Sequence, residues 1–200
     1  MALTRHNIQY HELILEIINS EKFKINLEKI NINYSNLKQE NHIRNYILEQ
    51  VNEFLSANNY SRHRAFAEHP RVNGFRVDLS IINQDEINNP FKIEFKYQFS
   101  GDNKDMLNYL KVIKKDFEHR SSDLFVLIIA NWNKAEKEIF DDKWGITSNL
   151  SRYISKNNVW RENIRASFQS IENTNLIETE CIKLSSPYEI EYYLYVLTNK

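Results

Sequence analysis

Two neighbouring stretches of this 200-residue sequence alternate apolar and polar residues, and their polar positions include two carboxylic acids and an amine. The stretches are Phe75–Ile81 and Phe91–Phe99. Because the side chains of a β-strand point alternately to its two faces, Asp78 lies on the polar face of the first stretch, and Glu94 and Lys96 lie on the polar face of the second. The turn-forming residues between the stretches predict a hairpin.

Two registers of this hairpin bury both apolar faces together. One register sets Asp78 opposite Glu94, and the other sets Asp78 opposite Lys96 with Glu94 on the diagonal. Either register brings all three side chains within the range of cross-strand neighbours.

Two carboxylates at this range repel each other unless a cation lies between them. Oxygen ligands favour Mg²⁺, with Mn²⁺ as a substitute, and the single cysteine (Cys181) and scattered histidines exclude the usual zinc sites. Lys96 is suited to hold or deprotonate an attacking water and to offset charge on a phosphate. The chemistry indicated is metal-dependent phosphodiester hydrolysis.

An acidic residue two positions before a lysine is common, and here it also occurs at Asp102 and Asp141. Only Glu94 lies in an alternating strand that follows a second, acidic strand. The competing interpretation is an amphipathic hairpin with a solvated polar face, on which Asp78 and Lys96 form an ordinary surface pair.

An Asp, a gap of fifteen residues and then Glu-x-Lys, followed by a helix and an apolar strand, resembles the PD-(D/E)XK nuclease superfamily over about residues 40–131. The resemblance implies that Asp78 and Glu94 are metal ligands and that Lys96 activates water, on a mixed sheet with helices on both sides. Val77 stands where the named motif has proline. Members often add an acidic residue before Asp78. Glu49 is the preferred candidate for it, and Glu53, Glu40 and Glu68 stay open.

Hydrophobic periodicity predicts the elements that position these residues. Helices are expected over about residues 4–20, 37–57, 103–119, 134–142 and 158–170, and strands over 62–69, 74–82, 91–99, 123–131, 176–184 and 188–197, with 22–32 ambiguous. The first three strands form a meander. The expected fold is α/β, with a central mixed sheet flanked by helices, a restriction endonuclease-like core and a C-terminal β-rich extension.

Cationic residues flank the predicted site in the sequence. Phosphate contacts are expected from Arg62, Arg64, Arg71 and Arg76, and Gln98 is either a further polar group of the site or an exposed residue. A second group after the site, Lys111, Lys114, Lys115, His119 and Arg120, is equally typical of a solvated helix face.

Composition indicates a single domain over residues 1–200, with a core at about 37–131, a helical extension at 1–36 and C-terminal helices and β-stretches at 132–200. The three Gly and three Pro leave no stretch typical of a linker. We expect no membrane span, a cytoplasmic location and, without a Gly-rich phosphate loop, no nucleotide cofactor.

The predicted function is a type II restriction endonuclease that cuts duplex DNA as a homodimer, because two-strand cutting suits two-fold symmetry. Alternatives are a junction-resolving, repair, transposition or defence-complex nuclease of the same fold, or a catalytically inactive module that binds nucleic acid or protein. The tyrosines of the last stretch, Tyr188, Tyr192, Tyr193 and Tyr195, suit either the dimer interface or the core.

Overall fold

The computed structural model describes residues 9–72, 74–102, 106–147 and 150–200. The starts of two expected helices, at residues 4–8 and 103–105, lie outside these ranges. No helix within them has the length and apolar character needed to cross a membrane.

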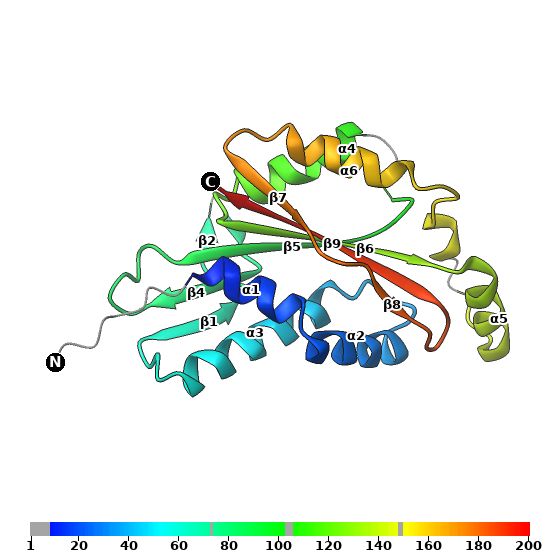
Figure 1. Ribbon diagram of the computed structural model, residues 1–200, viewed down its shortest axis with the longest axis horizontal. Coiled ribbons are helices and arrows are strands. Elements are labelled where there is room, and N and C mark those ends of the chain that lie inside the picture. The colour runs from blue at the N-terminus through cyan, green and yellow to red at the C-terminus, as the bar shows by residue number, and fades with distance from the viewer. Residues whose placement is uncertain (1–8, 73, 103–105, 148–149) are drawn as a thin grey trace.

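A mixed sheet of seven strands forms the centre of the molecule (Figure 1), as the sequence predicts. Its strands are β1 (His63–Ala67), β4 (Leu79–Asn83), β5 (Phe91–Phe99), β6 (Leu124–Trp132), β7 (Thr174–Glu178), β8 (Ile182–Leu184) and β9 (Ile190–Asn199). Their spatial order is β1-β4-β5-β6-β9-β7, and β8 also pairs with β9. Only β5 and β6 are parallel to each other among these pairs, so β1, β4 and β5 form the expected antiparallel meander.

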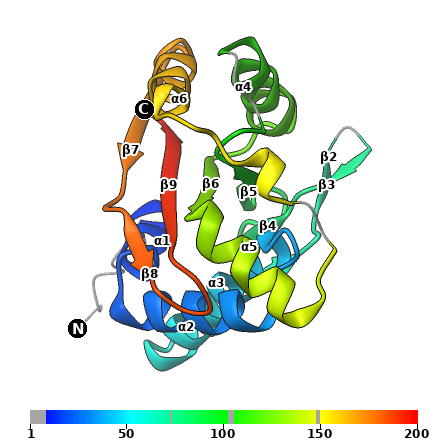
Figure 2. The same ribbon diagram turned by 90° about the vertical axis from the view of Figure 1, so that its right-hand side faces the viewer.

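Helices cover both faces of this sheet, which gives three layers (Figures 1 and 2). One face is covered by α1 (Tyr10–Ile18), α2 (Glu21–Asn33) and α3 (Glu40–Ala57), and the other by α4 (Met106–Ile113), its π-helical continuation η1 (Lys114–Glu118) and α6 (Val159–Gln169). Two further elements, α5 (Lys134–Trp144) and the 3-10 turn η2 (Leu150–Tyr153), follow the end of β6.

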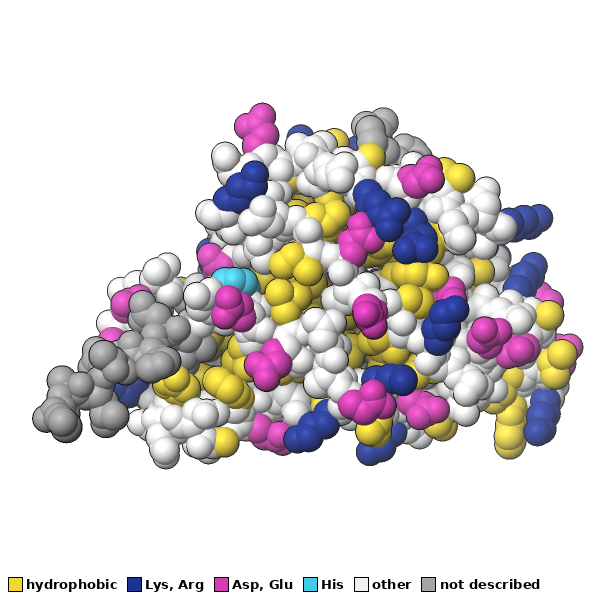
Figure 3. All heavy atoms as spheres, in the orientation of Figure 1, with side chains coloured by type: hydrophobic (Ala, Val, Ile, Leu, Met, Phe, Trp, Pro, Cys, Tyr) yellow, Lys and Arg dark blue, Asp and Glu magenta, His cyan; other side chains and the backbone are white. Residues whose placement is uncertain are grey.

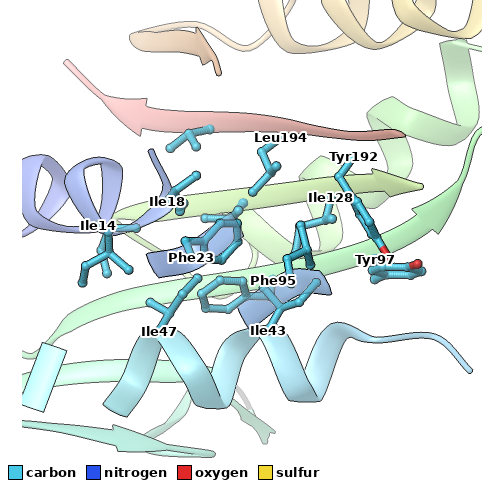
Figure 4. Close-up of a cluster of buried hydrophobic side chains, with 14 of the residues drawn as sticks. Ile14, Ile18, Phe23, Ile43, Ile47, Phe95, Tyr97, Ile128, Tyr192 and Leu194 are labelled. Atoms are coloured by element: carbon cyan, nitrogen blue, oxygen red, sulfur yellow. The ribbon is translucent and has the colours of Figure 1, made fainter. Parts of the chain in front are cut away.

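The larger core lies between the sheet and the first three helices. Figure 4 shows Ile14, Phe23 and Ile47 of the helices pointing toward Phe95 of β5 and Leu194 of β9. All five side chains are buried, and burial of apolar area at roughly 25 cal/mol per Å² is the main force that holds the layers together. The even-numbered residues of β5 therefore face the opposite side, toward α4 and η1.

Two expectations about individual elements need correction, and one segment left ambiguous is now assigned. The expected strand 74–82 is interrupted at Val77 and Asp78, and its first part belongs to a separate hairpin, β2 (Arg71–Val72) with β3 (Phe75–Arg76). The expected strand 176–184 is also divided, into β7 and β8. The ambiguous segment 22–32 is helical as part of α2, whose N-cap Ser20 accepts a hydrogen bond from the Phe23 N–H.

The tyrosine-rich last strand belongs to the core. Tyr188, Tyr192 and Tyr195 are buried, and β9 lies inside the sheet between β6 and β7. The hydroxyl of Tyr192 donates to Gln39 Oε1 at 2.7 Å, beside the N-terminus of α3.

Candidate active site

Asp78, the residue directly before β4, lies opposite Glu94 of β5. Leu79 pairs with Ile93 in the antiparallel ladder of β4 and β5, and continuing this register by one residue brings Asp78 to Glu94. This is the first of the two registers that the sequence allows. The two carboxyl groups are close enough to share a hydrogen bond when one of them holds a proton.

Glu94 is a fully buried acid with 0% exposure. Its Oε2 forms an ion pair with Nη1 of Arg120, whereas its Oε1 has no hydrogen-bond donor among the described residues. Burial, followed by the negative charge of Asp78, raises the pKa of Glu94 to about 9 from its ordinary value of 4.5. Burial raises the pKa of Asp78 as well, although the Phe95 N–H opposes that rise. The pair therefore holds one proton tightly unless a further cation joins it.

Three carboxylates occupy the edge of β5 that faces β4. The two strands pair only through Phe91–Ile93, so within the described part of the chain the edge of β5 beyond Ile93 has no strand partner on that side. Its backbone N–H groups donate to side chains instead: Phe95 N to Asp78 Oδ2 at 2.8 Å, Tyr97 N to Glu40 Oε2 at 2.6 Å and Phe99 N to Asp102 Oδ2 at 2.9 Å. The site thus forms where β4 and β5 stop pairing.

Lys96 lies two residues beyond Glu94 on the same face of β5. Its side chain is 36% exposed, and its Nζ lies 3.8 Å from Asp116 Oδ2. Its positive charge also lowers the pKa of Glu40, which burial raises. An accessible amine therefore stands beside a buried acid pair.

Among the acidic residues that the sequence left open, Glu40 is the one that reaches this cluster. Glu40 is the first residue of α3, and Asp78, Asp116 and Lys96 all act on its pKa. Glu49, nine residues along the same helix, points to the opposite side because successive helical residues turn by about 100°. Glu49 is exposed and lies near Tyr46. The preference for Glu49 is not supported by this geometry.

The side chains of the two remaining alternatives have other partners. Glu53 is exposed and accepts a hydrogen bond from Gln50. Glu68 forms an ion pair with Arg44 of α3, and Arg76 is 3.9 Å from it.

Sequence reasoning missed Asp116 and assigned Arg120 only to a cationic group. Asp116 is buried, and its Oδ1 is 3.6 Å from Nη2 of Arg120. Asp116 lies in the π-helical turn η1, and Arg120 lies just after it. In this turn the His119 N–H donates to the carbonyl of Lys114, five residues earlier, instead of four residues earlier as in an α-helix. The signal available in the sequence was an acid and an arginine spaced by four on the helix after Glu-x-Lys.

Some of the residues predicted to contact phosphate lie near Asp78, and others lie farther from it. Arg64, Arg71 and Arg76 are exposed on β1 and on the β2–β3 hairpin, which immediately precedes Asp78. Arg62 forms an ion pair with Asp85 at the far end of β1. Gln98 is 5% exposed, so the alternative that it is an exposed surface residue is wrong.

The donor set around the acid pair fits Mg²⁺ better than a metal that needs many protein ligands. Over residues 9–72, 74–102, 106–147 and 150–200, no group of three or more His, Cys, Asp and Glu side chains is arranged to hold a metal ion. Mg²⁺ usually keeps several waters and takes one or two carboxylates plus substrate phosphate. Asp78, together with the Oε1 atom of Glu94 that lacks a donor, matches this requirement.

Comparisons with protein-family models, with curated proteins and with solved structures find no match.

Proposed function

We propose that this protein is a Mg²⁺-dependent nuclease that hydrolyses phosphodiester bonds in duplex DNA. The observation that supports the proposal most directly is the contact between Asp78 and Glu94 across β4 and β5, with the accessible Lys96 on the same face. The mixed sheet and its flanking helices agree with the resemblance to the PD-(D/E)XK superfamily. Mn²⁺ is expected to substitute for Mg²⁺.

Asp78 and Glu94 are the groups that would hold the ion, and a bound ion would supply charge stabilisation at the phosphate. The Phe95 N–H fixes the Asp78 carboxylate on the strand that carries Glu94 and Lys96, so the three groups keep their spacing. Lys96 orients the attacking water and offsets the charge that develops on the phosphate. Glu40, held by the Tyr97 N–H, accepts a hydrogen bond from that water or from the Lys96 ammonium.

The substrate class and assembly follow from the same proposal. The exposed arginines beside Asp78 suit a phosphate backbone, and a type II restriction endonuclease working as a cytoplasmic homodimer is the first candidate. A junction-resolving, repair, transposition or defence-complex nuclease would use the same site on a different DNA.

Cleavage of supercoiled plasmid with Mg²⁺, Mn²⁺ or EDTA tests the activity. We expect nicking or linearisation only with the metal ions, and a loss of about 100-fold or more in Asp78→Asn and Lys96→Ala, the scale on which single catalytic groups act. Glu40→Gln should lose activity as well.

Two matched controls separate the site from its surroundings. Lys92→Ala removes a lysine two residues on the other side of Glu94 on the same strand face, and Glu49→Gln changes the opposite side of α3. Both should cleave as the parent protein does. The proposal fails if plasmid, single-stranded and branched DNA all stay intact with either metal, or if the parent rate persists in Asp78→Asn and Lys96→Ala. Intact DNA would favour the inactive interaction module, whereas a persistent rate in both variants would place the catalytic groups elsewhere in the chain.

A further inference from the structure

Arg120 is the cation that contacts the acid pair directly. Its Nη1 binds Glu94 Oε2, its Nη2 lies 3.6 Å from Asp116 Oδ1, and its guanidinium lies 5.6 Å from the centre of the Phe75 ring on the β2–β3 hairpin. Only 15% of its side chain is exposed. Arg120 is therefore held from three sides, by β5, by η1 and by the hairpin.

The contact with Glu94 conflicts with the proposed ion site. A divalent ion at Asp78 and Glu94 would place further positive charge beside a guanidinium that already uses one of the Glu94 oxygens. At such range, charges of like sign interact strongly in a poorly solvated site. Although Oε1 of Glu94 is open to the ion, the two positive charges repel each other, so binding of the ion weakens the contact between Arg120 and Glu94.

The contacts with Asp116 and Phe75 do not depend on Glu94. If Nη1 left Glu94, these two partners would still keep the guanidinium next to the acid pair. An arginine with free donors is the side chain best suited to bind a phosphate through two parallel hydrogen bonds. The phosphate that reacts has to approach the same place.

We propose that Arg120 is a ligand of the substrate phosphate and that, before the divalent ion binds, it rests on Glu94 in competition with that ion. This inference deepens the proposed nuclease function and depends on it. Arg120 thus occupies Oε2 of Glu94 until the ion and the DNA arrive together.

Two binding measurements on the folded full chain test the proposal. In titration calorimetry with Mn²⁺ and no DNA, Arg120→Gln should bind the ion more tightly by about fivefold or more, the lower range of coupling between linked sites. With Ca²⁺ in place of Mg²⁺ to slow cleavage, the same variant should bind duplex DNA more weakly by about fivefold or more. An arginine with a purely structural role would weaken both kinds of binding when it is replaced.

Arg165→Gln is the matched control, because Arg165 pairs with Glu178 on α6 and β7, away from the acid pair. It should leave both affinities unchanged. If Arg120→Gln does not fold, Arg120→Lys and Phe75→Leu replace it, since Phe75 is exposed. Each of these variants should bind Mn²⁺ more tightly and duplex DNA more weakly than the parent protein.

Mn²⁺ affinity that stays equal or falls in the folded variants overturns the proposal, and so does unchanged DNA affinity. Failure of the nuclease proposal itself is read separately, from the absence of plasmid cleavage by the parent protein.

Discussion

At the scale of single residues, the central feature is the buried carboxylic acid Glu94. Its charged form is favourable only when a cation lies beside it. Glu94 has one arginine partner and one acid neighbour, and its pKa of about 9 reflects the balance in favour of the proton. Sites that bind metal or perform catalysis often retain such destabilising groups. The cost of this group can be measured without any substrate.

We predict that the metal-free protein loses stability as the pH rises from about 5 to 9. The unfolded chain releases the Glu94 proton near its ordinary pKa of 4.5, whereas the folded chain keeps it until about 9. The contribution of Glu94 is therefore fully present at low pH and is lost by up to about 1.4 kcal/mol for each pH unit in this range.

Urea unfolding in EDTA at several pH values measures this slope. Glu94→Gln, which cannot ionise, should flatten it, and the exposed Glu49→Gln should not. Equal slopes in the parent protein and Glu94→Gln would show that Glu94 ionises normally in the folded state.

The meeting of Asp78 with Glu94 was predictable because the alternation of two strands and a short turn fix which side chains share a face. Glu40 was named but not preferred, since its position depends on where the N-terminus of α3 meets β5, which is a long-range contact. Asp116 was missed although its spacing of four from Arg120 is visible in the sequence, because it lies in a π-helical turn that a regular 3.6-residue period does not predict.

At the scale of elements, a buried polar network holds α3 against the sheet. Tyr192 of β9 donates to Gln39, and Gln39 directly precedes Glu40. The Gln39 amide also lies 3.4 Å from Asn31 of α2, whose own amide donates to the Ser186 carbonyl. The network therefore fixes the end of the helix that carries Glu40.

We predict that Tyr192→Phe lowers the free energy of unfolding by about 1–3 kcal/mol, because Gln39 Oε1 would be left buried without its donor. Denaturant unfolding measures the change. Tyr193→Phe, on the same strand but half-buried and bonded to Glu191, should lose less. A loss in Tyr192→Phe no larger than in Tyr193→Phe would mean that the network contributes little.

The order and type of the main elements followed from hydrophobic periodicity, and the fold class is confirmed. The interruption of the strand at Val77 and Asp78 was not predictable, since residues 75–81 alternate perfectly. The chain instead leaves β1 at Glu68, forms the β2–β3 hairpin and returns when the Glu68 N–H donates to the Asp78 carbonyl at 3.0 Å. Tertiary pairing overrides the local pattern there.

At the scale of the whole molecule, the β2–β3 hairpin places two exposed arginines on the side opposite α1, β7 and β8. Figure 3 shows the side with α1, β7 and β8, where cationic and acidic side chains are interspersed. The β2–β3 hairpin lies on the other side (Figure 2) and presents Arg71 and Arg76. Polyanions are therefore expected to bind at the hairpin even though the formal net charge is −1.

We predict that Arg71→Ala/Arg76→Ala weakens duplex DNA binding. The slope of log affinity against log salt should fall by about 0.9 for each phosphate that the variant no longer neutralises. Fluorescence anisotropy over a salt series provides the measurement. Lys24→Ala/Lys183→Ala removes the same charge from α2 and β8, and it should leave the slope unchanged. Equal effects of the two double variants would remove the hairpin from the DNA-binding surface.

The carboxylates along the open edge of β5 have a further consequence for self-association. An exposed strand edge offers a template on which a second chain can add a strand, and this is a common route to aggregation. Asp78, Glu40 and Asp102 occupy the N–H groups that such a strand would need. These acids therefore also shield the edge of β5 beyond its pairing with β4, and their negative charges would repel an approaching backbone carbonyl.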